Sequence, residues 1–164
     1  MFARHFINSF DFAHHGRELH GVVPVAELPR LQDLLADPAG EISYVVRGWQ
    51  GKDGKPSLEV SMEGVCQLRC QRCLGGFAYP VKLVTRLMLA SQAELDDAAI
   101  DEADEQDSIL ADDHLDVLAL LEEELLLSLP FAPKHPLGTC RPAVEELERP
   151  DENPFAILAG LKKK

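Results

Sequence analysis

Two short segments, far apart in the chain, carry residue types that bind transition metals. Cys70 and Cys73 form a C-x2-C pair, and two glycines follow it closely. Glycines permit the tight turn from which two thiolates can point at one ion. His135 and Cys140 follow much later with H-x4-C spacing. If the two segments meet in space, they supply the ligands of a Cys3His zinc site that holds one ion per chain.

The C-x2-C pair has two other interpretations. It could form a hairpin tip with free thiols, with His135 an ordinary loop residue. It could also be a redox pair in which Arg72 lowers the pKa of a neighbouring thiol. Redox pairs normally open a helix after a strand, whereas here glycines and a further strand-like segment follow. We therefore favour a structural or metal-binding role over thiol redox chemistry.

No enzyme active site is indicated by the sequence. It has no Gly-rich phosphate loop, nucleophile elbow or Ser-His-Asp arrangement, and its other histidines lack metal-binding spacing. We therefore predict a protein that is not an enzyme.

The elements that would position the cysteines are mainly strands. Residues 41–49 alternate between polar and apolar side chains, and residues 51–56 contain the Asp-Gly pair of a tight hairpin turn. Residues 58–70 alternate again and place Cys66 on the apolar face, so we expect Cys66 to be a core residue. With a further strand over residues 81–89, the C-x2-C pair lies at the tip of a hairpin.

Two segments have helical periodicity. Residues 25–35 predict a short amphipathic helix. Residues 115–129 predict the main helix, with Asp113 or Asp116 as its N-cap and Glu122–Glu124 on its solvated side. The sequence thus predicts an α+β fold, in which an antiparallel β-sheet is packed by one main α-helix.

Negative charge is concentrated in one part of the chain. The formal net charge is −12, and residues 91–129 hold fourteen Asp and Glu but no Lys or Arg. We interpret residues 91–114 as a mobile acidic loop. Such a block repels phosphate backbones and attracts basic proteins, although it could simply keep the chain soluble.

The C-terminal part predicts a second, smaller unit. We expect residues 1–140 to form the α+β domain, residues 141–152 a flexible linker, and the end of the chain a short NPFAIL helix. Phe155, Leu158 and Leu161 recur every three residues. This apolar stripe is expected to dock in a partner's groove or to fold back on its own domain.

Direct RNA binding is the alternative to protein binding. The outer face of the sheet, near the C-x2-C pair, is expected to gather basic side chains, with Trp49 as a stacking platform. These side chains are Arg47, Arg69, Arg72, Lys82 and Arg86. The ordinary polar face of a half-exposed sheet is the simpler interpretation.

The expected compartment is the cytoplasm. No apolar run is long enough to cross a membrane, and the N-terminus lacks the pattern of a secretory signal. Thiols in that compartment stay reduced, which favours metal ligands over disulfides.

Three separated motifs resemble those of one known family. They are CQRCL at residues 70–74, LEEELLLSLP at 121–130 with His135 and Cys140 after it, and NPFAIL at 153–158. Together they closely resemble the bacterial YceD family, which is named for the accumulation of large-subunit ribosomal RNA. The resemblance implies a link to 23S rRNA, no established enzymatic activity, and a gene that often neighbours one for a large-subunit ribosomal protein. It also implies that Cys66 is an extra cysteine beside the recurrent ones.

We therefore expect a non-catalytic ribosome-biogenesis factor that supports 23S rRNA accumulation and large-subunit assembly. Its expected partner is a large-subunit ribosomal protein or an assembly factor, contacted through residues 91–129 and the terminal helix. A protein that acts directly on 23S rRNA is the alternative, and a C-x2-C thiol-redox protein is the least favoured one.

Overall fold

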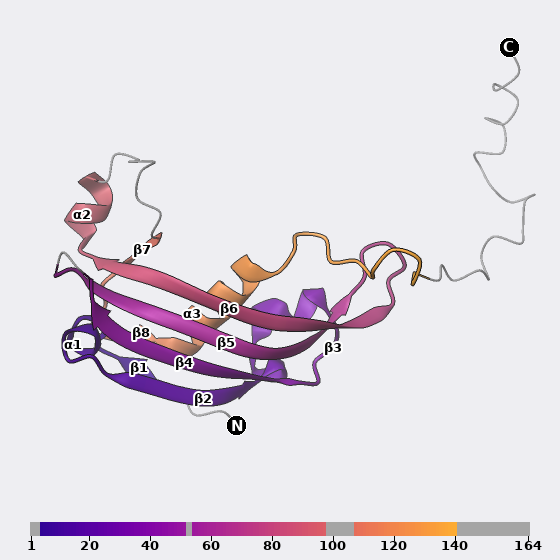
Figure 1. The fold of residues 1–164 in the computed structure, drawn as a ribbon, viewed down its shortest axis with the longest axis horizontal. Coiled ribbons are helices and arrows are strands. Elements are labelled where there is room, and N and C mark those ends of the chain that lie inside the picture. Colours follow the sequence, from indigo (N-terminus) through magenta and orange to yellow (C-terminus); the bar gives the residue numbers. More distant parts are fainter. Residues whose placement is uncertain (1–3, 52–53, 98–106, 141–164) are drawn as a thin grey trace, which may run out of the picture.

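The computed structural model describes residues 4–51, 54–97 and 107–140. Its main feature is a six-stranded sheet in the order β2-β4-β5-β6-β7, with β3 paired to β5 outside this row. The strands of this sheet are β2 (Glu18–Pro24), β3 (Leu35–Asp37), β4 (Glu41–Gln50), β5 (Pro56–Arg69), β6 (Gly76–Ala90) and β7 (Asp107–Leu110). Strands β4, β5 and β6 are long and run along the length of the molecule (Figure 1).

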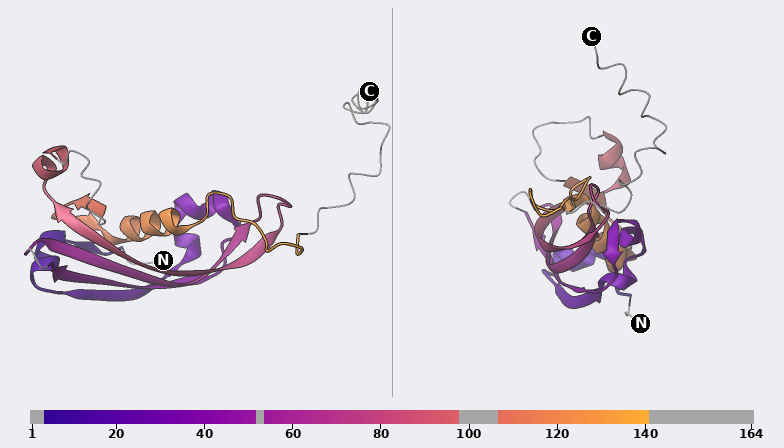
Figure 2. Two further views of the ribbon diagram at one scale, coloured as in Figure 1. Left: turned by 45° about the horizontal axis from the view of Figure 1, so that its top comes forward. Right: turned by 90° about the vertical axis from the view of Figure 1, so that its right-hand side faces the viewer.

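Short helices and a small second sheet complete the described fold. Strand β1 (Phe6–Ile7) pairs antiparallel with β8 (Leu115–Asp116). The helices are α1 (Ser9–His14), η1 (Val25–Glu27), η2 (Pro29–Leu34), α2 (Gln92–Asp97) and α3 (Val117–Ser128). The sheet is curved, and α3 and the two 3-10 helices lie on the same face of it (Figure 2).

The core lies between that face of the sheet and α3. Alternate residues of β5, from Leu58 to Leu68, point into it, and α3 contributes leucines such as Leu121 and Leu125. Asp116 caps α3, because its carboxylate accepts hydrogen bonds from the backbone N–H groups of Leu118 and Ala119. The predicted α+β fold class is confirmed.

Helix α1 packs unusually close to the sheet at Gly48 of β4. A Cβ atom at this position would collide with the backbone of Phe12 and Ala13. Only a glycine therefore allows this contact, which fixes α1 against the end of β4. Helix α1 has only six residues and is not predicted from the sequence.

The prediction of a mobile acidic loop over residues 91–114 is wrong at both of its ends. Helix α2 begins after Ser91, whose N–H and hydroxyl both donate to the Glu94 carboxylate at 2.7 Å. This S-x-x-E pattern is a capping box, which marks the start of a helix. The acidic composition of the segment favoured the prediction of a loop instead. Strand β7 pairs parallel with the end of β6, so the sheet is not purely antiparallel. Residues 98–106 lie outside the described residues.

Residues 25–35 are not one amphipathic helix. They form η1 and η2, separated at Leu28, and the segment ends in β3. Pro29 explains the break, because it cannot donate the backbone hydrogen bond that would continue a helix through it.

The prediction that Glu122 and Glu124 are solvated is also wrong, since only 5% and 7% of their surfaces are exposed. Glu122 accepts a hydrogen bond of 2.6 Å from the backbone N–H of Arg30, at the start of η2. A buried carboxylate thus joins α3 to η2. Glu123, which lies between Glu122 and Glu124 in the sequence, is exposed as predicted.

The predicted linker and terminal helix lie outside the described residues, together with Phe155, Leu158 and Leu161. The division of the chain at residue 140 therefore stays a prediction. In the described part of the chain, no helix is long and apolar enough to cross a membrane.

Candidate metal centre

The hairpin between β5 and β6 brings the two metal-binding segments together. Cys70 and Cys73 lie in the turn at its tip, and the chain returns to this tip after α3 with His135 and Cys140. The tip is the end of the long strands farthest from α2 (Figure 1). One ligand atom from each of the four residues lies within 4.8 Å of all the others.

The distances between these atoms suit one tetrahedral zinc ion. The sulfurs of Cys70 and Cys140 are 3.5 Å apart, and Nδ1 of His135 lies 3.3 Å from the Cys73 sulfur and 3.6 Å from that of Cys140. Zinc bonds of about 2.3 Å to sulfur and about 2.0 Å to nitrogen place neighbouring ligands roughly 3.5–3.8 Å apart. The four cysteines of the chain are free thiols, so no disulfide competes for this arrangement.

The turn that holds Cys70 and Cys73 is fixed by its own backbone. The Leu74 N–H donates to the Cys70 carbonyl at 2.8 Å, and the Cys70 N–H donates to the Gly75 carbonyl at 2.9 Å. The Arg72 N–H points at the Cys70 sulfur, 3.4 Å away. Leu74 has a φ of 61°, a conformation that residues other than glycine rarely adopt. The turn therefore aims both sulfurs to the same side at some cost in backbone strain.

The returning segment is held against this turn by both backbone and ring contacts. The Gln71 N–H donates to the Pro133 carbonyl at 2.8 Å. The His135 ring packs on Phe77 of β6, with ring centroids 5.0 Å apart. These contacts point Nδ1 of His135 toward the sulfurs.

The surroundings of Cys70 and Cys140 favour thiolates, which are the forms that bind metal. Burial opposes the charge of Cys70, but N–H groups of His135, Arg72 and Cys73 outweigh it and lower its pKa to about 5. A hydrogen bond from Arg72 lowers the pKa of Cys140. The Gly75 N–H favours the Cys73 thiolate, yet the adjacent sulfurs raise the pKa of Cys73.

Hydrogen bonds to Cys70 and Cys140 also raise the pKa of His135. Negative charges thus crowd around one point between the four side chains. A divalent cation at that point would relieve their mutual repulsion.

Cys66 takes no part in this cluster. Its side chain is fully buried on the core face of β5, and burial raises the pKa of its thiol. The prediction of a core cysteine is confirmed.

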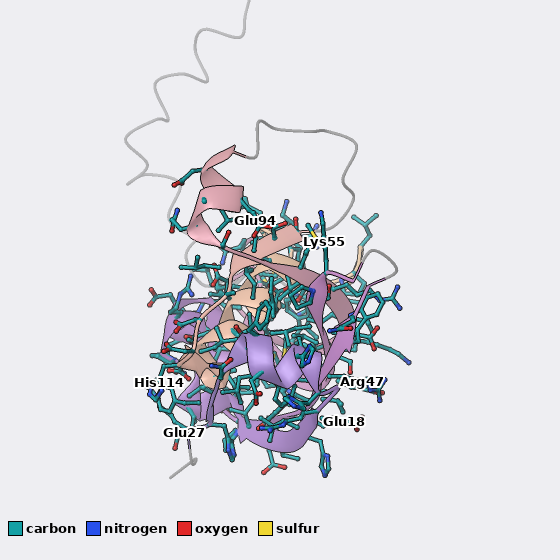
Figure 3. The ribbon with its side chains drawn as sticks, turned by 90° about the vertical axis from the view of Figure 1, so that its left-hand side faces the viewer. Glu18, Glu27, Arg47, Lys55, Glu94 and His114 are labelled. Carbon is teal, nitrogen blue, oxygen red and sulfur yellow. The ribbon has the colours of Figure 1, made fainter. Side chains whose placement is uncertain are left out.

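The predicted basic face is divided by acidic side chains. Arg47 and Arg86 both pair with Glu59, which lies between them in the sheet register, and Arg47 also pairs with Glu18 at 2.9 Å (Figure 3). Arg86 additionally lies over the Trp49 ring at 5.9 Å. Lys82 lies opposite Glu63.

Arg69 and Arg72 stand apart from that group, at the metal-centre tip. Two further residues near this tip, Phe131 and Lys134, were not predicted from the sequence as functional residues. Both side chains are exposed beside the metal centre. The sequence feature that could have identified them is an aromatic and a cationic residue in a stretch bounded by prolines. Such a stretch does not form a helix that could bury these side chains.

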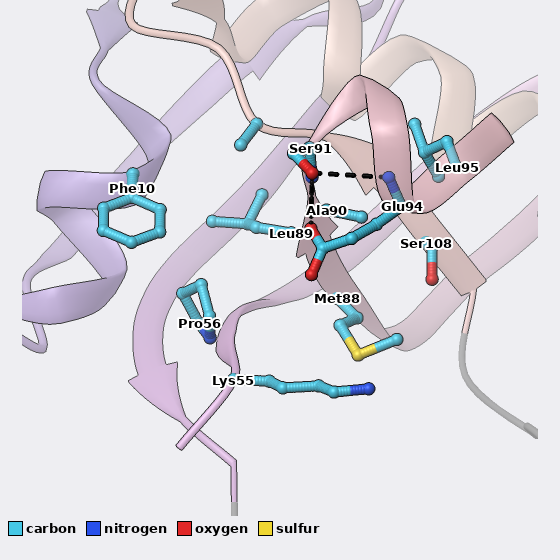
Figure 4. A pocket seen from close by; sticks show the side chains of 11 residues that line it. Phe10, Lys55, Pro56, Met88, Leu89, Ala90, Ser91, Glu94, Leu95 and Ser108 are labelled. Atoms are coloured by element: carbon cyan, nitrogen blue, oxygen red, sulfur yellow. Dashed lines mark hydrogen bonds between the residues drawn. The ribbon is translucent and has the colours of Figure 1, made fainter. Parts of the chain in front are cut away.

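The opposite end of the molecule holds a pocket of about 340 Å³. It is lined by apolar side chains such as Phe10, Met88 and Leu89, with Lys55 and Glu94 at its edge (Figure 4). Glu94 points its carboxylate back to Ser91. The exposed carboxylates of Asp96, Asp107, Asp112 and Asp113 lie on or beside α2 and β7, at this acidic end of the molecule rather than at the metal centre.

Comparison with known proteins decides the family. The family model described as large ribosomal RNA subunit accumulation protein YceD matches residues 58–162, more than half of the chain. The chain belongs to the YceD family. The YceD match includes both halves of the metal centre.

One YceD relative, the large ribosomal RNA subunit accumulation protein YceD of Haemophilus influenzae, is 30% identical over 161 residues. The alignment covers 88% of this chain and 87% of that protein. No solved structure matches the chain significantly. The predicted family resemblance is confirmed.

Proposed function

We propose that this YceD-family protein is a non-catalytic, cytoplasmic factor that supports 23S rRNA accumulation and large-subunit assembly. It acts by binding a basic protein, either a large-subunit ribosomal protein or an assembly factor. The description of the matching family and the name of the Haemophilus influenzae relative support the process. The charge distribution of the chain supports the mode of action.

The observation that carries the mechanism is the segregation of exposed acids around α2 and β7. Asp96, Asp107, Asp112 and Asp113 are exposed there, and residues 91–129 contain no Lys or Arg to neutralise them. Such a predominantly acidic surface attracts a basic protein and increases the rate of encounter. The terminal helix, with its apolar stripe, is proposed to add a second contact to the same partner.

We also propose that the metal centre binds one structural zinc ion. Cys70, Cys73, His135 and Cys140 fill all four tetrahedral positions, which leaves none open for catalysis. The ion would hold the segment after α3 against the hairpin tip. It would thereby fix the point at which the predicted C-terminal linker leaves the domain.

The proposed process is tested in a strain from which the gene is deleted. We expect the ratio of mature 23S to 16S rRNA to fall, and free large subunits to decrease in sucrose gradients. The wild-type gene should restore both. An unchanged ratio in the deletion strain would refute the proposal.

The proposed mechanism is tested with a charge variant and its matched control. Asp96, Asp107 and Asp113 are changed to Asn; the control changes the exposed acids Asp33 and Asp37 to Asn and Glu41 to Gln. After ribonuclease treatment, tagged wild-type and control proteins should retain a basic ribosomal protein or assembly factor. The Asp96, Asp107 and Asp113 variant should lose most of it. Equal capture by both variants would exclude the acidic end as the binding surface.

A further inference from the structure

Three large apolar side chains project from the metal-centre tip. Phe131 is fully exposed, Leu137 is 92% exposed and Leu74 is 70% exposed. Leu74 combines this exposure with its positive φ. A glycine would adopt this backbone conformation without strain and would expose no apolar side chain, and only the smaller part of the leucine is buried. Strained, exposed apolar residues of this kind mark contact surfaces.

The same tip is cationic, although the whole chain has a net charge of −12. Residues 65–80 and 125–140 of this tip contain Arg69, Arg72 and Lys134 and no Asp or Glu, and strand β3 adds Asp37 opposite Gln67 of β5. Zinc with three thiolates would contribute a formal charge of −1, so that with Asp37 the tip keeps a net charge of about +1. An anionic partner is therefore complementary to this end of the molecule.

Hydrogen bonds hold the segment that carries Phe131 and Lys134 against the C-x2-C turn. The Gln71 N–H bonds the Pro133 carbonyl, and Nη2 of Arg72 donates to the His135 carbonyl at 3.5 Å. These bonds place the Phe131–Lys134 stretch along the C-x2-C turn. Ring faces beside cations are the combination that binds unpaired bases and their phosphates.

We propose that the metal-centre tip binds single-stranded RNA. Phe131 stacks on an unpaired base with the leucines beside it, and Arg72 and Lys134 contact phosphates. This inference goes beyond the proposed function, which uses the acidic end of the molecule. It also replaces the divided outer face of the sheet as the RNA-binding surface, because Arg47 and Arg86 are neutralised there by Glu18 and Glu59.

The test uses the purified full chain and a fluorescein-labelled, unstructured RNA of twelve nucleotides. Phe131→Ala should weaken binding about tenfold, as expected for loss of one stacked base. The matched control is Phe10→Ala, which removes an exposed ring at the opposite end and should change binding less than twofold. Circular dichroism and metal content should be unchanged in both variants, since both rings are exposed.

Salt dependence tests the phosphate contacts. The two phosphate contacts, from Arg72 and Lys134, predict a slope of about −1.4 for the logarithm of the association constant against the logarithm of salt concentration. Lys134→Gln should reduce the magnitude of this slope by about 0.7, because one single-strand phosphate contact is lost. Arg86→Gln, an equal change of charge on the outer face, should leave the slope unchanged.

Three results would overturn the proposal. They are no RNA binding by the wild-type protein in 50 mM salt, equal losses in the variants and their controls, and equal affinity for a duplex of the same sequence. Tighter binding of a polyglutamate peptide than of the RNA would instead assign the tip to an acidic protein. Capture of a basic protein after ribonuclease treatment is independent of all these results, so the proposed function can stand if this inference fails.

Discussion

At the scale of single residues, Leu74 departs most clearly from expectation. Its left-handed backbone costs a leucine about 1 kcal/mol or more, whereas glycine adopts this conformation freely. We predict that Leu74→Gly raises the free energy of unfolding modestly, by up to about 1 kcal/mol, since glycine's flexibility in the unfolded chain offsets part of the gain. Urea denaturation of the metal-loaded protein measures this change.

Leu137→Gly is the matched control for Leu74. Leu137 is even more exposed than Leu74, but its φ is not positive. Glycine therefore relieves no strain at this position, and it only increases the conformational entropy of the unfolded chain. We expect a loss of roughly 0.5–1 kcal/mol. If both substitutions change stability in the same direction, strain at Leu74 is not significant.

The cysteines give a second prediction at this scale. Cys140→Ser should reduce the metal content from one ion per chain to a small fraction, because a neutral hydroxyl replaces a thiolate ligand. Cys66→Ala should keep the metal and cost on the order of 1 kcal/mol, as for a small cavity in the core. Elemental analysis and denaturation measure the two effects. Metal loss in Cys66→Ala alone would show that the ligand set is wrong.

The sequence identified the four clustered residues because a C-x2-C pair and an H-x4-C pair together supply the four ligands of a tetrahedral zinc site. It could not identify Phe131 or Leu74 as part of the tip. Their importance lies in exposure and backbone angle, which depend on how the returning segment crosses the hairpin.

At the scale of elements, buried Glu122 connects α3 with η2. Glu122→Ala leaves the Arg30 N–H without its acceptor and should lower the free energy of unfolding by about 1–2 kcal/mol. The neighbouring control Glu123→Ala changes an exposed carboxylate and should have almost no effect. Equal midpoints of urea denaturation for the two variants would contradict the role assigned to Glu122.

Glu124 on the same helix makes stability depend on pH. Burial raises the pKa of Glu124 above its ordinary value of 4.5, a hydrogen bond with Thr85 opposes the shift, and Asp107 and Glu123 add to it. The folded protein therefore holds this proton to a higher pH than the unfolded chain does. The free energy of unfolding should fall as the pH rises from 4.5 through the folded pKa.

Glu124→Gln removes this titration while keeping an acceptor for Thr85. We predict that this variant is more stable than the wild type at pH 7, and that the difference closes as the pH falls below 4.5. Denaturation curves over this pH range measure it. A difference that is constant with pH would indicate a change in packing instead.

Elements with strong alternation could be predicted from the sequence: β4 and β5 lie within two residues of the expected ranges, whereas β6 begins five residues earlier than expected. The elements that were missed are short. Helix α1 depends on contact with Gly48, and β7 has four residues that pair only because the end of β6 is available. Tertiary contacts rather than local propensity decide such segments.

At the scale of the whole molecule, the two ends carry opposite charge, so two partners can be bound independently. We predict that changing Asp96, Asp107 and Asp113 to Asn leaves RNA affinity within about twofold, and that Phe131→Ala leaves protein capture unchanged. Anisotropy and ribonuclease-treated capture of each variant measure both properties. Loss of both functions in either variant would indicate one shared surface or a folding defect.

The metal centre also links two parts of the chain that are far apart in sequence. Cys73 and His135 are 62 residues apart in sequence, and Cys70 and Cys140 are 70 apart. A bound ion would close a loop that contains β6, α2, β7 and α3, and closing a chain of this length costs about 3.5–4 kcal/mol of entropy when it is unfolded. Chelation would therefore remove this constraint on the unfolded chain and lower the free energy of unfolding of the whole loop, including the acidic end, which lies far from the metal.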